Sequence, residues 1–487
     1  MRSQTKIFSQ IVQDHLGPQP VIVQIDDTIS SMVSKMVGMN QSSALVVDAD
    51  GDLRGIVTER DLAQRIVFQC QPTDPVREVM TAPVKTVYAD DYLYYAIARM
   101  RRFGWRHMPV VDRMNRPIGT INRADALAVA AEQILQQVDA ISQEGTLEGL
   151  QGIKASQVEL ADGLFQDNVP APEIQSLLSH INRDIHRRVI EGALRAMADE
   201  GWGDPPVRFA AIIMGSGGRG ENFLYPDQDN GFVLADYPDG KHTAIDAFFI
   251  ELADRMTRDL DAVGFPLCPG NVMATNPLWR KTSRQWRGQL AIWSRKSGLN
   301  IARLVDIFFD FQAFYGDLDL ARMLRADTTA MTKSSAPFLR RLYEAEESHL
   351  GVALGLFGRL VAEKGDPEHK GEINLKHAGT LPLVHCARLL SLREGIEETP
   401  TLRRIDALHE KQVLDDDRHD YLRGAFAHIT GLLLRRQIAD FKAGRAVGSH
   451  VHLDDLSRRE QDMLVDSLKA IADLRKMAHV EFTGDLF

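Results

Sequence analysis

An internal repeat near the N-terminus of this 487-residue chain limits its possible folds more than any other pattern in the sequence. Three short segments recur at one spacing of 64 residues: IDDTISSM begins at residue 25 and ADDYLYYA at 89, ALVVD at 44 and MPVVD at 108, and GIVTERDL at 55 and GTINRADAL at 119. Each copy has the pattern of an extended entry, a helix, two short apolar strands around a turn, and a closing helix. The spacing therefore predicts two similar βαββα units over residues 20–134.

This repeat resembles a tandem pair of CBS domains, a family whose two copies pack with pseudo-two-fold symmetry and hold adenosine ligands in the clefts between them. The resemblance implies that Thr58 contacts the phosphates and Asp61 the ribose in the first copy, with Asn122 and Asp125 in those places in the second. A carboxylate can accept from both ribose hydroxyls, and a hydroxyl at a helix start lies beside free backbone N–H groups.

A structural interpretation of the same residues stays open. Thr58 and Asp61 have the spacing of a helix N-cap and its first-turn acid, and many CBS pairs only dimerise. The pair is therefore either an adenosine-nucleotide site or a dimerisation unit, and we expect a homodimer through it.

A glycine-rich segment, VRFAAIIMGSGGRGENFLYPDQDNGFVLAD, spans residues 207–236. Residues 209–214 predict a buried strand, the glycines predict a turn that lets the backbone approach a ligand closely, and a second strand follows. Asp227 and Asp229 are two residues apart, so on a strand their side chains would point to the same face. Two carboxylates beside such a turn can hold Mg²⁺ and a triphosphate.

A strand followed by Gly-Ser, Arg, Glu and Asp-x-Asp resembles the active site of the nucleotidyltransferase superfamily. The resemblance implies catalytic roles for Arg219, Asp227 and Asp229, with Mg²⁺ held by the two aspartates. It also implies nucleotide contacts from four residues of the motif: Gly215, Ser216, Arg219 and Glu221. The competing interpretation is an acidic turn before a strand, with the glycines as a loop.

One departure from the superfamily concerns a third carboxylate, which active members usually carry on a later strand. The candidate strand here, residues 271–275, contains no acid, and Asn271 stands near that place. The third acid usually helps to deprotonate the attacking hydroxyl and completes a second metal site. We therefore expect one metal ion at this site, and the pattern does not secure a second.

The resemblance narrows further along the chain. The segments CPGNVMATNPLWRKTSRQW and LVDIFFDFQAFYGD resemble the nucleotidyltransferase domain related to the adenylyl-removing and PII-uridylylating enzymes of nitrogen control. INLKHAGTLPLVHCARLLSL, TLRRIDAL and LLLRRQ resemble the helical substrate-binding domain that follows it. Residues 335–487 are nearly all helical by pattern, which predicts a bundle of four or more helices. Six basic side chains there either face an acceptor or are solvated or paired: Lys376, His377, Arg388, Arg404, Arg435 and Arg436.

Residues 271–305 contain no acidic side chain but seven basic ones. Trp279, Trp286 and Trp293 are seven residues apart, which would place them along one stripe of a continuous helix. The tryptophans are either core anchors below a solvated basic face or part of a phosphate-binding wall that faces the Asp pair.

Composition limits the remaining function classes. The net charge of −10 argues against bulk nucleic-acid binding. No apolar run approaches the ~20 residues of a membrane helix, and the N-terminus lacks the pattern of a signal peptide. Three widely separated cysteines favour a reducing compartment. We expect a cytoplasmic protein that binds neither nucleic acid nor membrane.

The predicted fold is α/β plus α: an N-terminal helix (1–19), the CBS pair (20–134), a nucleotidyltransferase domain with a small mixed sheet and a helical connector (135–305), and a helical substrate-binding domain (306–487). The predicted function is transfer of a uridylyl or adenylyl group from a nucleoside triphosphate to an acceptor such as a PII-like protein, regulated by an adenosine ligand on the CBS pair. The alternative is a non-catalytic adenine-nucleotide sensor with a degenerate transferase domain. The missing third acid favours the sensor, and the intact Gly-Ser to Asp-x-Asp block favours the enzyme.

Overall fold

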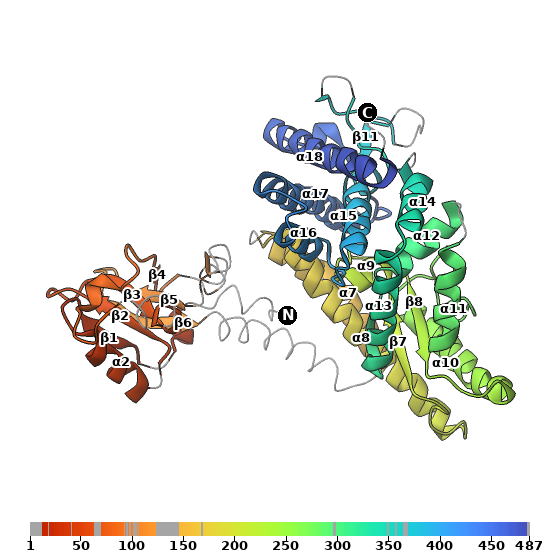
Figure 1. Ribbon diagram of the computed structural model, residues 1–487, viewed down its shortest axis with the longest axis horizontal. Helices are drawn as coiled ribbons and strands as arrows, with labels where there is room; N and C mark the ends of the chain where they lie inside the picture. Colours follow the sequence, from red (N-terminus) through yellow and green to blue (C-terminus); the bar gives the residue numbers. More distant parts are fainter. Residues whose placement is uncertain are drawn as a thin grey trace. The chain divides into compact units, whose positions relative to one another are not determined.

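The computed structural model describes residues 12–17, 19–39, 41–62, 70–91, 93, 96, 99–100, 105, 107–122, 146–166, 169–295, 299–347, 350–355, 358–363 and 369–484. The chain divides into two compact units, Met1–Ala140 and Ile141–Phe487 (Figure 1).

The smaller unit contains two three-stranded sheets with the same connectivity. In the first copy, β1 runs parallel to β2 and β3 returns antiparallel, and in the second copy β4, β5 and β6 repeat this order. The strands are β1 (Val21–Gln24), β2 (Ser43–Val47), β3 (Leu53–Thr58), β4 (Val87–Tyr88), β5 (His107–Val111) and β6 (Pro117–Asn122). The first copy also contains the helices α2 (Ile29–Gly38) and α3 (Glu59–Asp61), and η3 (Val76–Glu78) precedes the second.

The two sheets share an irregularity of register. The pairing of β2 with β3 shifts between Val46 and Val47, and that of β5 with β6 shifts between Val110 and Val111. These positions are one repeat length apart, so the same irregularity of strand pairing recurs at the spacing found in the sequence.

The copies are joined by apolar and backbone contacts. Leu45, Leu53 and Val111 share one buried cluster, and the Leu53 N–H donates to the carbonyl of Asn115 (N···O 3.1 Å). Of the predicted N-terminal helix, residues 1–11 lie outside the described residues, and η1 (Val12–His15) is a single 3-10 turn. It packs on the core of the second copy through Val12.

The larger unit is built around a four-stranded mixed sheet with the order β10-β7-β8-β9. β7 (Phe209–Ile213) is antiparallel to both β10 (Gln312–Gly316) and β8 (Asn230–Leu234), and β9 (Arg280–Thr282) is parallel to β8. Side chains alternate between the faces of a strand, so β7 contributes to two separate cores. Phe209 and Ala211 pack in one core, and Ala210 and Ile212 pack in the other.

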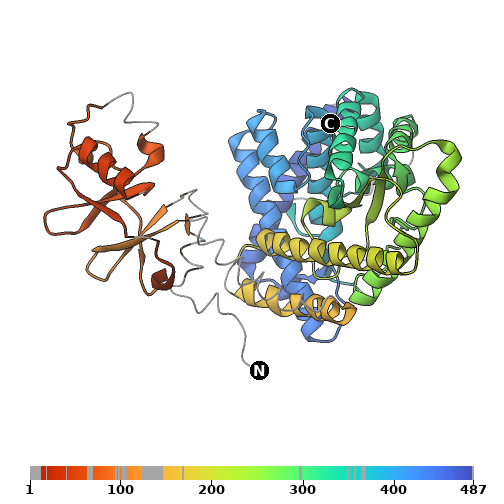
Figure 2. The same cartoon turned by 90° about the horizontal axis from the view of Figure 1, so that it is seen from below.

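The first of these cores is covered by long helices that lie side by side in Figures 1 and 2. They are α7 (Leu147–Gln166), α8 (Ala171–Asp199) and, after the short turn η4 (Asp239–Lys241), α10 (His242–Val263). The second core contains residues from the remaining helices: α11 (Ser283–Trp293), α12 (Leu299–Phe308), α13 (Leu318–Lys333), α14 (Ala336–Glu347), α15 (Leu381–Glu394), α16 (Thr401–Glu410), α17 (Asp416–Lys442) and α18 (Arg458–Thr483).

This second core extends from Ala210 to Phe482, so the boundary predicted at residues 305 and 306 passes through a shared apolar interior. The C-terminal region is helical as the pattern predicts, but it also contains a two-stranded antiparallel sheet of β11 (Glu372–Asn374) and β12 (His450–His452), the latter followed by the turn η7 (Leu453–Asp455). Among the described residues, no helix has both the length and the apolar character needed to cross a bilayer.

Candidate functional site

A cleft of about 150 Å³ lies where the Gly-Ser turn meets the C-terminal helices. One side of its lining consists of residues from the predicted motif: Ser216, Arg219, Glu221, Asp227 and Asp229. The other side comes from the C-terminal region, including Lys376, Thr380, Val384, Phe426 and Ser449. The structure therefore brings these motif residues together and adds a second wall, of which the sequence analysis had named only Lys376 as a candidate.

Asp227 and Asp229 lie in the segment that leads into β8, rather than on the strand itself, which begins at Asn230. The Met214 N–H still donates to the carbonyl of Asp229 (N···O 2.8 Å), so β7 and β8 remain paired beyond the end of the strands. Gln228, between the two acids, is buried and donates its amide to the carbonyl of Thr257. Both carboxylates consequently line one cleft.

The Asp229 carboxylate lies directly against Gly215. A Cβ placed on Gly215 would be 2.7 Å from Asp229 Oδ2, and the residue has a φ of +57°, so a side chain there would be strained and would clash. Burial raises the pKa of Asp229 to about 6, although a hydrogen bond from the Cys268 thiol opposes this shift. Burial and the Asp229 charge raise the pKa of Cys268 to about 11, so the thiol stays protonated and donates a hydrogen bond to the Asp229 carboxylate. Sequence reasoning missed Cys268, because a single cysteine in a loop has no motif.

Lys376 is a cation whose charge acts on both aspartates. It lies at the start of the π-helical turn η6 (Lys376–Thr380). Burial raises the pKa of Asp227, and the Lys376 charge lowers it; the same charge acts on Asp229. Lys376 was one of six basic candidates from the sequence, and no spacing distinguished it from the others. Its position across the cleft is a product of tertiary packing.

Arg219 and Glu221 are bonded to partners within the protein. The Arg219 Nε donates to Glu221 Oε2 (2.6 Å), and its Nη1 donates to Asp310 Oδ2 (2.7 Å). The other Glu221 oxygen accepts from the backbone N–H of Thr401 (2.6 Å). These side chains fix the turn α9 (Gly215–Arg219) while they line the cleft, which is a positioning role beside the predicted nucleotide contacts.

The acid that anchors this network, Asp310, is completely buried. It also accepts from Arg388 Nη2 (2.5 Å) and Arg404 Nη2 (2.7 Å), so these two arginines do not face an acceptor as the sequence had allowed. The turn packs tightly here: a Cβ on Gly218 would be 1.6 Å from the Asp310 carbonyl oxygen. Thr399 donates its hydroxyl to the Gly218 carbonyl (2.9 Å), so the segment that connects α15 to α16 holds the glycine turn.

The strand predicted for a third carboxylate does not form. Residues 271–275 are irregular, and Asn271 is exposed in a turn with a φ of +54°. The strand that pairs with β8 on the side away from β7 is instead β9, which also contains no acid. In the described parts of the chain, one group of three His, Cys, Asp or Glu ligands has all its ligand atoms within 4.8 Å of one another, and none of its members lines this cleft.

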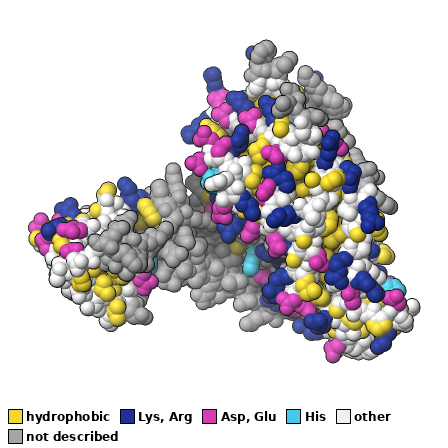
Figure 3. Space-filling view, in the orientation of Figure 1, with side chains coloured by type: hydrophobic (Ala, Val, Ile, Leu, Met, Phe, Trp, Pro, Cys, Tyr) yellow, Lys and Arg dark blue, Asp and Glu magenta, His cyan; other side chains and the backbone are white. Residues whose placement is uncertain are grey.

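The tryptophans form core anchors, and the alternative of a phosphate-binding wall is wrong for the described residues. Trp279 precedes β9 while Trp286 and Trp293 are on α11, so there is no continuous helix, but all three are buried with ring centroids 6.1–6.5 Å apart. Arg280 and Arg284 are paired with acids, and Figure 3 shows both basic and acidic side chains on this face of the larger unit. The side chains of Lys296 and Arg303 lie outside the described residues.

A second cleft, of about 230 Å³, lies between the two repeats of the smaller unit. Thr58 and Asp61 line it together with Trp105 and His107 of the second copy. The Thr58 N–H (2.9 Å) and Oγ1 (2.7 Å) both donate to Asp61 Oδ2, and these residues form a capping box while they line the cleft. The side chain of Asn122 and the whole of Asp125 lie outside the described residues.

Comparison with known proteins gives three family matches. The CBS domain matches residues 12–67 and 76–132, the family described as "Putative nucleotidyltransferase DUF294" matches residues 155–299, and the "Putative nucleotidyltransferase substrate binding domain" matches residues 336–482. Together these matches extend over both units.

Individual relatives match shorter parts of the chain. An uncharacterized protein of Methanopyrus kandleri is 33% identical over 105 residues, which is 21% of this chain and 54% of that protein. A homoserine O-acetyltransferase of Methanosarcina acetivorans is 31% identical over 111 residues, 23% of this chain and 20% of that protein. The match thus spans about half of the first relative and a fifth of the second.

Among solved structures, the CBS domain of a CBS domain containing membrane protein from Sphaerobacter thermophilus has 29% sequence identity and a TM-score of 0.23, covering 25% of this chain and 88% of that chain. The three family matches show that the chain combines a CBS domain pair with the DUF294 nucleotidyltransferase domain and with the substrate-binding domain that accompanies it.

Proposed function

We propose that the larger unit transfers a nucleoside monophosphate from a nucleoside triphosphate to an acceptor hydroxyl. The observation that carries this proposal is the pair of carboxylates, Asp227 and Asp229, side by side in a cleft with the Gly-Ser turn. The family of residues 155–299 supports the same class of reaction.

The residues of the cleft fit a magnesium ion. Asp227 and Asp229 offer the hard oxygen ligands that Mg²⁺ prefers, and burial disfavours the ionised form of both. A bound cation offsets that penalty. Asp227 and Asp229 would hold the ion, which when bound neutralises charge on the phosphates.

The chain's own groups then have separate tasks. Lys376 supplies positive charge opposite the two aspartates, and Ser216 places a hydroxyl in the lining beside them. An acceptor oxygen attacks the α-phosphorus, the bond from that phosphorus to the pyrophosphate oxygen breaks, and pyrophosphate leaves while the hydroxyl proton passes to solvent. Arg219 and Glu221 keep the turn in position for this step.

We infer that the acceptor enters over the C-terminal wall of the cleft. This wall contains Lys376, Thr380 and Phe426, which all belong to the region matched as a substrate-binding domain. The resemblance to the PII-uridylylating enzymes favours a PII-like protein as acceptor, with UTP or ATP as donor. These finer assignments rest on the resemblance.

A second candidate is a nucleotide sensor without catalysis. The observation in its favour is that β9 has no acid and that, among the described residues, no third ligand atom groups with those of Asp227 and Asp229 within 4.8 Å. Glu221 also lines the cleft, but its carboxylate is bonded to Arg219 and to the Thr401 N–H. Such a protein would bind a triphosphate in the cleft and release it unchanged.

Incubation with each labelled nucleoside triphosphate, Mg²⁺ and cell extract separates the two candidates. The transferase places label from the α-phosphate on an acceptor and releases pyrophosphate, and the label identifies both the donor base and the acceptor. Binding of a triphosphate with no transfer to any component would establish the sensor instead.

For the smaller unit, we propose that an adenosine nucleotide binds in the cleft between the repeats and regulates the transferase. Asp61 lines that cleft with Trp105 and His107, so a carboxylate and two ring systems lie where a ribose and a base would bind. This composition supports the ligand class that the CBS resemblance implies.

We expect the full-length Asp61→Ala variant to bind AMP, ADP or ATP more weakly. Loss of a hydrogen bond to a carboxylate costs about 1.5–3 kcal/mol, which is roughly a ten- to hundredfold loss in affinity by calorimetry. Asp50→Ala is the matched control, because Asp50 is an exposed acid of the same repeat outside the cleft. Equal affinity in all three proteins would show that Asp61 does not contact the ligand, and no binding to any of them would leave the pair as a dimerisation unit.

A further inference from the structure

The antiparallel strands β11 and β12 bring together polar groups that are about eighty residues apart in the sequence. Glu372 lies opposite His452, and Asn374 lies opposite His450. Side chains alternate along each strand, so these four share one face, and Ile373 and its partner Val451 are buried on the other. The register of two three-residue strands therefore creates a face with two imidazoles and a carboxylate.

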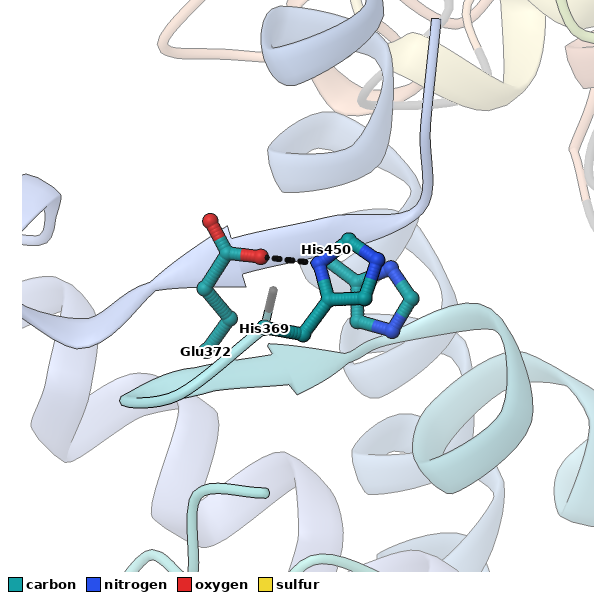
Figure 4. A group of neighbouring side chains, drawn as sticks. All are labelled: His369, Glu372 and His450. Carbon is teal, nitrogen blue, oxygen red and sulfur yellow. Dashed lines mark hydrogen bonds and ion pairs between the residues drawn. The ribbon is translucent and has the colours of Figure 1, made fainter. Parts of the chain in front are cut away.

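His369, just before β11, joins this face and completes a group of three ligands. Its Nδ1 lies 2.6 Å from Glu372 Oε2, and its ring is stacked on that of His450 with centroids 3.5 Å apart and planes at 6°. The ligand atoms of His369, Glu372 and His450 all lie within 4.8 Å of one another. Figure 4 shows the carboxylate and the two rings together beside the strand pair.

Other groups also contact these side chains: Asn374 Nδ2 lies 3.3 Å from His450 Nε2. His450 Nε2 lies 3.4 Å from Glu363 Oε1, so a second carboxylate reaches the same imidazole. Arg436 lies 3.8 Å from the other oxygen of Glu372, Oε1, and is also paired with Asp440. Glu372 Oε2 consequently faces the imidazoles, while Oε1 faces the arginine.

We propose that His369, Glu372 and His450 bind one divalent transition-metal ion of the Zn²⁺ class, with Glu363 in reach as a fourth ligand. Imidazole nitrogens favour such ions over Mg²⁺ and Ca²⁺, which take oxygen ligands. Tetrahedral ligands about 2.0–2.1 Å from a zinc ion are about 3.4 Å apart. Ligand atoms within 4.8 Å therefore reach the ion through small side-chain rotations that separate the stacked rings.

The metal would stabilise the strand pair that supports the cleft. The Leu375 N–H donates to the Ser449 carbonyl (3.0 Å), which continues the pairing of β11 and β12, and the next residue is Lys376. Ser449 and Lys376 both line the cleft that contains the aspartates. An ion bridging 369–372 to 450 would therefore link the two segments that carry these residues. Binding itself does not depend on the proposed transferase function.

The test uses the full chain, without a histidine tag, after removal of metal with a chelator. We expect Zn²⁺ to bind at one equivalent by calorimetry and to raise the thermal midpoint, and Co²⁺ to give the intense visible bands of a four-coordinate site with nitrogen ligands. His450→Ala should weaken this binding by at least about a hundredfold. His452→Ala is the matched control: it removes the same side-chain type from the same face of the same strand and should leave affinity unchanged.

Circular dichroism checks that His450→Ala is folded, and Glu372→Gln, which keeps the shape of the side chain, serves if it is not. The proposal is overturned if the chain binds no equivalent of Zn²⁺ or Co²⁺, or if both His450→Ala and Glu372→Gln bind like the wild type. It is also overturned if His452→Ala loses as much affinity as His450→Ala. Retention of the Co²⁺ bands in Asp227→Ala separates this site from the cleft.

Discussion

Replacing Asp310 by asparagine lowers the free energy of unfolding of the larger unit by about 3–5 kcal/mol, the usual cost of removing one partner from a buried ion pair. Asp310 is fully buried and is bonded to Arg219, Arg388 and Arg404. Asparagine would leave three buried guanidinium groups without their shared counter-charge. It would also turn an amide N–H₂ toward these donors.

The pH dependence of this loss has a defined sign. Burial opposes ionisation of Asp310, but the charges of Arg388, Arg404 and Arg219 outweigh it and hold the pKa well below its ordinary value. Asp310 therefore stabilises the fold fully above the unfolded-state pKa of about 3.9, and the contribution disappears as the pH falls toward the lower, folded-state value. The difference between wild type and variant should be constant from pH 5 to 8.

Urea denaturation followed by tryptophan fluorescence measures the effect, because Trp279, Trp286 and Trp293 are all buried in this unit. Asp319→Asn is the control: Asp319 forms an exposed pair with Arg322, which is worth at most about 1 kcal/mol. An Asp310→Asn variant as stable as Asp319→Asn would show that the buried network does not hold the turn.

Replacing Asp229 by asparagine has the opposite effect on stability and removes function. Burial raises the pKa of Asp229 to about 6, so the folded chain keeps a proton that the unfolded chain loses near pH 4. Stability therefore falls as the pH rises from about 4 to about 6, and above that the buried charge costs the folded state up to about 2–3 kcal/mol. Asparagine avoids this cost and still accepts from Cys268.

We expect Asp229→Asn to be more stable than the wild type at pH 7, equally stable below pH 4, and inactive in nucleotide transfer. Thermal melts across this pH range and the labelled-triphosphate assay measure the two effects. Asp466→Asn, at an exposed acid of α18, should change neither. Lower stability of Asp229→Asn at pH 7 would mean that the carboxylate serves the fold rather than a ligand.

The sequence predicts those parts of the structure that repeat or that are local. The spacing of 64 residues predicts two similar sheets in the CBS pair, whereas the register shifts at Val46 and Val110 are evident only in the structure. The order of strand, glycine turn and Asp-x-Asp likewise placed Asp227 and Asp229 in one cleft, because these residues are neighbours along the chain.

The parts that the sequence could not predict depend on contacts across the fold. Lys376 and Cys268 reach the aspartates through packing of distant segments, and neither belongs to a local pattern. Residues 271–275 have the apolar content of a strand but lie in turns, because β9 takes the place beside β8. β11 and β12 are too short to show a period of two, so their histidines looked scattered.

Calorimetric titration with non-hydrolysable triphosphates whose α,β-bridge is a methylene group tests whether the cleft of Asp227 and Asp229 is a magnesium–triphosphate site. We expect one of them to bind at one equivalent with Mg²⁺, chelation of Mg²⁺ to weaken this binding, and Asp227→Ala to abolish it while Asp61→Ala does not. If chelation and Asp227→Ala leave the affinity for every triphosphate unchanged, the cleft is not such a site.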